Sequence, residues 1–183
     1  MGLIGHNSGM SFARGATWRK YCWTVARAEL LPTLPIEVVR LRVRRARELG
    51  LDYKTYASVR ATTGHDVVAF LFSSNALRVS VQVPVIPVDR AEKLATVMAN
   101  RIGLAVAPLQ ALALAQNGVL ESSHPAPFAL ANFADIRAAL RLALGKLPGD
   151  QVLLVGDMAL ERDWCAAGRL AGYLRADRFF AAQ

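Results

Sequence analysis

The 183-residue sequence has few of the residues from which metal and redox sites are built. It contains two cysteines, Cys22 and Cys165, and neither belongs to a C-x-x-C pair. Its three histidines, His6, His65 and His124, are dispersed along the chain. We therefore expect no metal-bound or other cofactor, and we expect two buried free thiols rather than a disulfide.

Long apolar runs and phosphate-binding signatures are also missing. No stretch approaches the roughly 18 apolar residues of a membrane-spanning helix, although 54% of the residues are hydrophobic. Neither G-x-x-x-x-G-K-[ST] nor G-x-G-x-x-G occurs, and residues 5–9, GHNSG, do not have the G-x-S-x-G register. Residues 1–15 lack the apolar centre of a secretory signal and are expected to form a flexible lead-in. A folded cytoplasmic protein with no membrane partner is the resulting expectation.

What the sequence has in excess is positive charge, concentrated in its first third. The net charge is +8. Residues 1–60 contain eleven Lys or Arg against four Asp or Glu, whereas residues 61–183 contain eleven against ten. Arginine outnumbers lysine by 18 to 4, and its planar guanidinium suits phosphate. This composition favours nucleic-acid binding, but GC-rich bacterial coding would produce the same bias without any function.

Residues 36–48 are predicted to form an amphipathic helix, with Pro35 at its start, where a missing N–H is tolerated. Apolar residues recur at spacings of three and four on one face: Ile36, Val39, Val43 and Ala46. A rotation of about 100° per residue places Arg40, Arg44 and Arg47 on the opposite side, flanked by Arg42 and Arg45.

A second short helix is predicted after a break at Gly50, with Asp52 as its N-cap. The spacing of Ala46 and Gly50 resembles the helix-turn-helix motif, and residues 52–60, DYKTYASVR, look like the recognition helices of LuxR-type regulators. The resemblance is confined to residues 40–60, and it implies that the second helix faces a DNA groove while arginines take phosphates. The nucleic-acid-binding residues predicted in this way are Arg40, Arg44, Arg45, Arg47, Tyr53, Lys54, Ser58 and Arg60.

The predicted partner is therefore DNA or RNA. A protein-interaction module is the alternative, in which the arginine face meets an acidic protein.

A third class of function, a small α/β enzyme, depends on residues 152–157, VLLVGD. A buried strand ending in Gly156-Asp157 puts a carboxylate where open α/β sheets bind ligands. The string resembles the last acidic motif of haloacid-dehalogenase-type phosphatases, which would make Asp157 and Asp163 magnesium ligands. That family also needs a nucleophilic D-x-D, and the sequence contains none. No catalytic residue is predicted, and capping of the following helix is the alternative role for Asp157.

The expected fold is α+β or α/β. A basic helical unit, residues 16–64, packs on a mixed β-sheet core with C-terminal helices, residues 65–183, as a separate unit or within one globular domain. The predicted strands are residues 67–72 and 77–85, which form a hairpin, and the buried strand QVLLVGD. The predicted helices span residues 17–30, 89–101, 133–144 and 161–174. Residues 105–116 fit a helix or a buried strand equally, and residues 122–128 are expected to be a loop.

Overall fold

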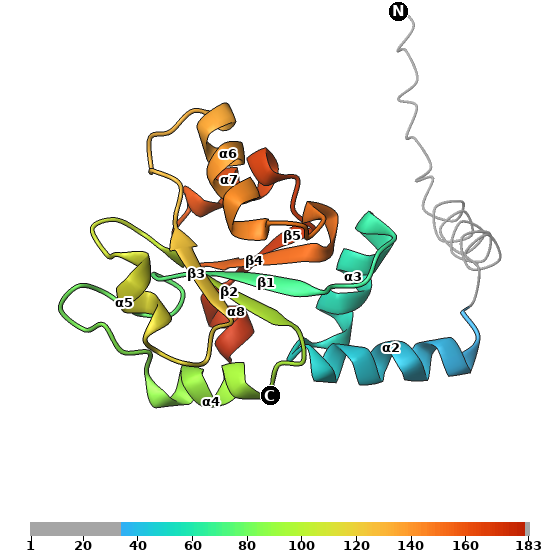
Figure 1. Cartoon of the computed structure of the whole chain (residues 1–183). Helices are drawn as coiled ribbons and strands as arrows, with labels where there is room; N and C mark the ends of the chain where they lie inside the picture. Colours follow the sequence, from blue (N-terminus) through green and yellow to red (C-terminus); the bar gives the residue numbers. More distant parts are fainter. Residues whose placement is uncertain (1–33, 182–183) are drawn as a thin grey trace, which may run out of the picture. The chain divides into compact units, whose positions relative to one another are not determined.

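The computed structural model of the chain describes residues 34–181 and shows an α/β protein (Figure 1). Within that range five strands form one sheet in the order β3-β2-β1-β4-β5. All four strand pairs are parallel, so the α/β class is confirmed and the expected mixed sheet is wrong. Contacts divide the chain into two units, Met1–Val39 and Arg40–Gln183. The predicted lead-in, the helix over residues 17–30 and Cys22 lie outside the described residues.

Helices and strands alternate along the described part of the chain. The strands are β1 (Ala69–Ser73), β2 (Asn100–Ala105), β3 (Ser122–Pro125), β4 (Val152–Gly156) and β5 (Gly172–Arg175). The α-helices are α2 (Ile36–Glu48), α3 (Tyr53–Thr63), α4 (Val88–Thr96), α5 (Ala111–Ala115), α6 (Phe133–Leu144), α7 (Glu161–Gly168) and α8 (Ala176–Phe180). A 3-10 turn, η1 (Gly149–Gln151), leads into β4. Within residues 34–181, no helix is both long and apolar enough to cross a membrane.

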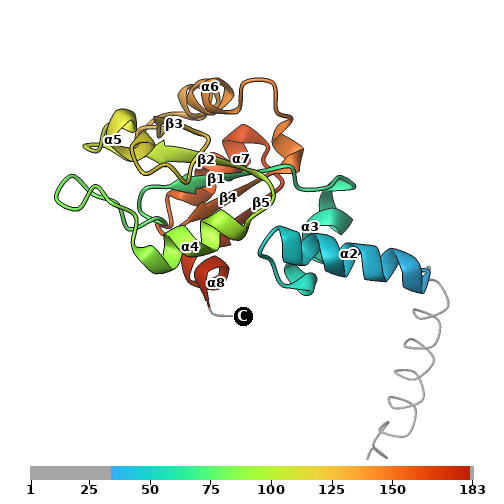
Figure 2. The same ribbon diagram turned by 60° about the horizontal axis from the view of Figure 1, so that its bottom comes forward.

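The central strand β1 and its neighbour β4 are buried along their whole length because helices cover both faces of the sheet. Every residue of β1 and of β4 is buried, as expected for parallel strands enclosed between two layers. One face contributes Phe70, Phe72 and Val155 to a cluster with residues of α2, α3, α4, α5 and α8. The other face contributes Leu71 and Leu154 to a second cluster with residues of α6 and α7. Figure 2 shows α4 and α8 on one side of the sheet and α6 on the other.

The predicted hairpin is wrong because β1 already has two parallel neighbours. It pairs with β2 on one side and with β4 on the other, so no edge is left for an antiparallel partner. After β1 the chain turns at residues 74–78, and residues 79–87 run without helix or strand to α4.

Three other boundaries differ from the sequence-based expectation for the same reason, which is pairing with a distant strand. Residues 100–105 belong to β2 rather than to the helix predicted over 89–101. Residues 122–125 form β3 rather than a loop, because they pair with β2. Residues 172–175 form β5 beside β4 rather than the end of a helix. The undecided segment 105–116 contains the end of β2 and the short helix α5.

The predicted helix over residues 133–144 is confirmed with both of its ends. The helix α6 ends at Leu144, followed by Gly145, and its N-cap Asn132 accepts hydrogen bonds from the backbone N–H groups of Ala134 and Asp135. The predicted apolar face of α2 packs only in part. Ala46 is buried and Val43 is half-buried, but Ile36 is 62% exposed.

The N-cap of α3 supports a first prediction. An Asp52 carboxylate oxygen accepts a hydrogen bond from the backbone N–H of Thr55 at 2.8 Å. We expect Asp52→Ala to lower the free energy of unfolding by about 1 kcal/mol, the usual cost of losing such a cap. Asp52→Asn is the matched control and should keep most of that stability, because asparagine caps equally well. The measurement is urea denaturation followed by circular dichroism. An equal loss in both variants would assign the effect to the Asp52 charge instead.

Candidate functional site

The arginine-rich helices α2 and α3 meet at a tight corner. Gly50 has a left-handed backbone with φ of +66°, a conformation that strongly favours glycine. The backbone N–H of Gly50 donates to Arg47 O, and that of Leu51 donates to Ala46 O, which ends α2. Leu49 and Leu51 are buried on either side of the turn. The corner is therefore specified locally, by glycine between two buried leucines.

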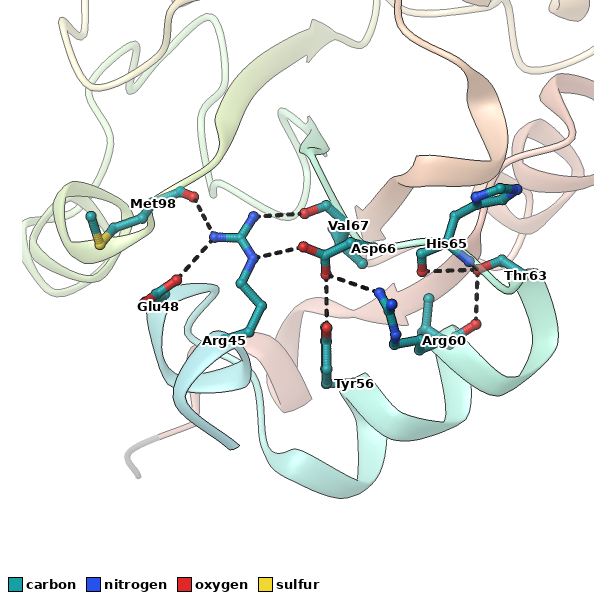
Figure 3. A network of polar contacts seen from close by, with 10 residues as sticks. Arg45, Glu48, Tyr56, Arg60, Thr63, His65, Asp66, Val67 and Met98 are labelled. Carbon is teal, nitrogen blue, oxygen red and sulfur yellow. Dashed lines mark hydrogen bonds and ion pairs between the residues drawn. The ribbon is translucent and has the colours of Figure 1, made fainter. Parts of the chain in front are cut away.

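Asp66, in the segment between α3 and β1, holds this corner to the sheet (Figure 3). One carboxylate oxygen accepts a hydrogen bond from Arg45 Nε at 2.9 Å, and the other accepts from the Tyr56 hydroxyl at 2.8 Å. The Arg60 guanidinium lies 3.9 Å from the same carboxylate. One acidic side chain thus joins α2, α3 and the chain that enters β1.

All three guanidinium nitrogens of Arg45 donate hydrogen bonds within the protein. Besides Asp66, its guanidinium donates to the Glu48 carboxylate at 3.1 Å, to Val67 O at 3.0 Å and to Met98 O at 3.3 Å. The sequence pattern assigned Arg45 to nucleic acid, but its donors are directed at the segments before β1 and β2 (Figure 3). Arg45 positions α2 in the folded chain.

The charges of this network shift the pKa values of its members. Burial opposes ionisation of Asp66, but hydrogen bonds from Tyr56 and Arg45 outweigh it, so the pKa of Asp66 is lowered. Burial raises the pKa of the Tyr56 phenol, and the hydrogen bond to Asp66 raises it further. Burial works against the charge of Arg45, but hydrogen bonds to Glu48 and Asp66 leave its pKa raised. At neutral pH Asp66 and Arg45 are therefore charged, while the Tyr56 hydroxyl keeps its proton and donates a hydrogen bond to Asp66.

The remaining predicted residues separate by exposure. Three arginines of α2 are exposed, and we call them the α2 arginine face: Arg40, Arg44 and Arg47. Among the ion pairs of the described residues, none involves Arg44 or Arg47. On α3, Lys54 and Ser58 are exposed, whereas Tyr53 and Arg60 are half-buried. The structure thus places five of the eight predicted residues at the surface and directs Arg45 and Arg60 toward Asp66.

A second candidate site is the carboxyl edge of the sheet between β1 and β4. From β1 the chain proceeds through β2 to the β3 edge and then returns to β4 beside β1, so the order of strands reverses there. Open α/β sheets bind ligands at this switch point. Here the polar groups bind one another instead. Asn75 donates to the Glu161 carboxylate at 2.9 Å, and that carboxylate accepts the backbone N–H groups of Asp157 and Met158 at 2.7 and 3.0 Å.

Sequence reasoning missed Glu161, which is 2% exposed and closes the β4–α7 loop. A glutamate at the start of a predicted helix was the available signal, since such a side chain commonly reaches back to free backbone N–H groups. The suggestion that Asp157 caps the following helix is wrong. The N-cap of α7 is Leu160, without a side-chain cap, and the Asp157 backbone is bound by Glu161.

The two weak metal candidates are not brought into a metal site by the described residues. Asp157 and Asp163 are both exposed, and no group of three ligating side chains occurs within residues 34–181. The residues that follow the centre of β1 are Ser73, Ser74 and Asn75, so that strand supplies no carboxylate beside Asp157. Cys165 is a free, half-buried thiol whose pKa is raised by burial.

Gly156 supports a second prediction, because it lets Glu161 and Tyr173 approach the end of β4. A Cβ at this position would lie 2.7 Å from the Tyr173 ring and would also strike the Glu161 carboxylate. We expect Gly156→Ala to lower the free energy of unfolding by about 1–2 kcal/mol through overpacking. Gly172→Ala at the start of β5 is the control, since its Cβ would meet the tip of Leu153 at 3.2 Å and Val59 at 4.0 Å, both of them ends of side chains. Thermal unfolding that ranks the two variants in the opposite order would contradict this account of the loop.

Comparisons with family models, with curated proteins and with solved structures found no match for this chain.

Proposed function

We propose that this chain binds nucleic acid through the α2 arginine face. The observation that carries the proposal is that the arginines of α2 differ in their surroundings. Arg45 donates hydrogen bonds to Asp66, Glu48 and two backbone carbonyls. Arg44 and Arg47, in contrast, are exposed and three residues apart. Arg45 thus holds α2 against the rest of the fold, and other arginines of the same helix lie exposed to solvent.

Phosphate is the chemistry that this surface suits best. Guanidinium groups donate paired, charge-assisted hydrogen bonds to phosphate oxygens. Residues three and four apart on a helix lie on the same side, so Arg40, Arg44 and Arg47 form a row along α2. Each phosphate that such a row neutralises releases counterions, and this sequence-independent term supplies most non-specific affinity for DNA. The net charge of +8 adds long-range attraction for a polyanion.

The helix-turn-helix resemblance extends the proposal to α3. In that reading the exposed Lys54 and Ser58, together with the half-buried Tyr53, face the bases while α2 holds the backbone. The rigid corner at Gly50 and the Asp66 network support such a role, because a recognition helix has to be held in a fixed orientation.

The test is a fluorescence-anisotropy titration of labelled duplex DNA and of single-stranded RNA with the full chain. At about 50 mM salt we expect saturable binding of the duplex, with an affinity that falls steeply by about 200 mM. Absence of binding to both probes at the lower salt would end the nucleic-acid proposal. Binding of the single strand alone would assign the surface to RNA.

A second candidate is an acidic protein partner, and Leu41 favours it. This side chain is 61% exposed among the arginines of α2, and protein interfaces combine apolar anchors with a polar rim. Leu41→Ser separates the two candidates, since it removes apolar contact without changing charge. Unchanged duplex affinity in this variant, with an unchanged set of proteins captured from a nuclease-treated lysate, would remove the second candidate.

A further inference from the structure

A basic cavity lies between α6 and α7, on the face of the sheet opposite α4 and α8. The two helices pack through Leu140 and Ala167, and a cavity of about 380 Å³ opens at their C-terminal ends. Gly149, which leads into β4, and Gly168, which precedes β5, both line it. The cavity is therefore at the amino ends of these strands, away from the switch point. Its volume falls in the range of about 300–1,000 Å³ typical of small-molecule sites.

Among the described residues, three arginines and no carboxylate line this cavity: Arg137, Arg141 and Arg169. Arg137 and Arg141 are four residues apart on α6, so they lie on the same side of the helix, where like charges repel. Arg169 follows α7 in a left-handed conformation with φ of +50°. Within residues 34–181 no ion pair involves any of the three. The described part of the chain thus brings three cations together without an acidic partner.

The negative C-terminal ends of α6 and α7 balance part of this positive charge but not all of it. Arg137 Nε donates to Ala167 O at 3.1 Å, in the last turn of α7, where cations are favourable. The C-terminus of a helix carries about −0.5 charge, so α6 and α7 together supply about −1 against three guanidinium groups. About two positive charges remain. A phosphate monoester carries about −1.5 to −2 at neutral pH.

We propose that this cavity binds a small phosphorylated molecule, as a site independent of the α2 arginine face. The guanidinium groups of Arg141 and Arg169 take the phosphate oxygens, and Arg137, anchored on Ala167, completes the positive side. Leu140, Leu144 and Leu147 line the rest of the cavity and pack against the apolar part of the molecule. At the usual ligand edge of such a sheet, Asn75 and Glu161 form hydrogen bonds within the chain, whereas the arginines of this cavity are exposed to solvent.

The experiment is isothermal titration calorimetry of the full chain with three probes: inorganic phosphate, phenyl phosphate and benzoate. We expect both phosphates to bind, phenyl phosphate more tightly because its ring reaches the leucines, and benzoate to bind at least about tenfold more weakly. Arg141→Gln should weaken phenyl phosphate binding by about tenfold or more, the usual loss for one charge-assisted pair. Arg169→Asn should do the same, since asparagine tolerates the left-handed conformation.

Two controls make the outcome decisive. Arg141 is exposed and forms no ion pair within the described residues, so its variant should unfold at the temperature of the parent chain. The double variant Arg44→Gln/Arg47→Gln should lose duplex DNA and keep phenyl phosphate, which separates this site from the proposed function. No heat of binding with either phosphate at millimolar concentration would overturn the proposal, and so would equal binding by Arg141→Gln and the parent. Equal affinity for benzoate would show an unspecific anion site and would also overturn it.

Discussion

Asp66→Ala is expected to lower the free energy of unfolding by about 2 kcal/mol. The change removes the acceptor for Arg45 and Tyr56 at 2.9 and 2.8 Å and leaves the Arg45 guanidinium with one fewer carboxylate beside it, since Glu48 still pairs with it. Breaking a buried pair costs about 3–5 kcal/mol. We expect less than that range because the Asp66 side chain is 36% exposed, and solvent screens a pair of that exposure. Urea denaturation gives the value.

The effect of Asp66 should also depend on pH. The pKa of Asp66 is lowered in the folded protein, so its contribution is complete above the unfolded pKa of about 4 and is lost as the pH falls through the lower folded pKa. The difference between the parent chain and Asp66→Ala should therefore shrink below about pH 4. Asp163→Ala removes an exposed carboxylate and is the control, with an expected cost below about 0.5 kcal/mol. Equal losses in the two variants would contradict the structural role of Asp66.

The triple variant Arg40→Gln, Arg44→Gln and Arg47→Gln is expected to stay folded and to lose most of its affinity for duplex DNA. Exposed substitutions usually change stability by less than about 0.5 kcal/mol each. Three lost phosphate contacts should weaken binding at about 50 mM salt by on the order of 10²–10³-fold. Fluorescence anisotropy measures the affinity, and thermal unfolding checks the fold.

The control for this triple variant is a second variant that loses the same number of positive charges at another site. Arg137→Gln, Arg141→Gln and Arg169→Asn together remove three positive charges from the α6–α7 cavity. This second variant should keep duplex affinity within about tenfold of the parent, because only long-range attraction is reduced. If both triple variants lose the same affinity, net charge rather than the α2 arginine face accounts for binding. If the α2 variant unfolds, its arginines are structural and the proposed face is lost.

Local signals in the sequence predict some elements closely. The helix α6 is bounded by Asn132, an N-cap, and by Gly145, and both are readable without knowledge of the rest of the chain. The strand β4 has the continuous apolar run expected of a buried parallel strand. The exposure of Arg40, Arg44 and Arg47 follows from helical periodicity alone.

Contacts between residues that are distant in sequence could not be predicted in the same way. The short edge strand β3, with the sequence SSHP, has no apolar pattern and is specified only by its pairing with β2. Arg169 ends the α7 region in a left-handed conformation that an arginine rarely adopts, so the break before β5 carried no glycine or proline signal at that position. Arg45 looks like its neighbours in the sequence, and its partner Asp66 lies 21 residues away.

The salt dependence of duplex binding tests the central claim most directly. Anisotropy titrations of the parent chain and of the α2 triple variant, at four salt concentrations between about 50 and 200 mM, give the slope of log K against log salt. Each neutralised phosphate contributes about −0.9 to that slope for B-DNA. We predict that the variant slope is shallower than that of the parent by about 3 units. Identical slopes would show that Arg40, Arg44 and Arg47 contact no phosphate and would contradict the account.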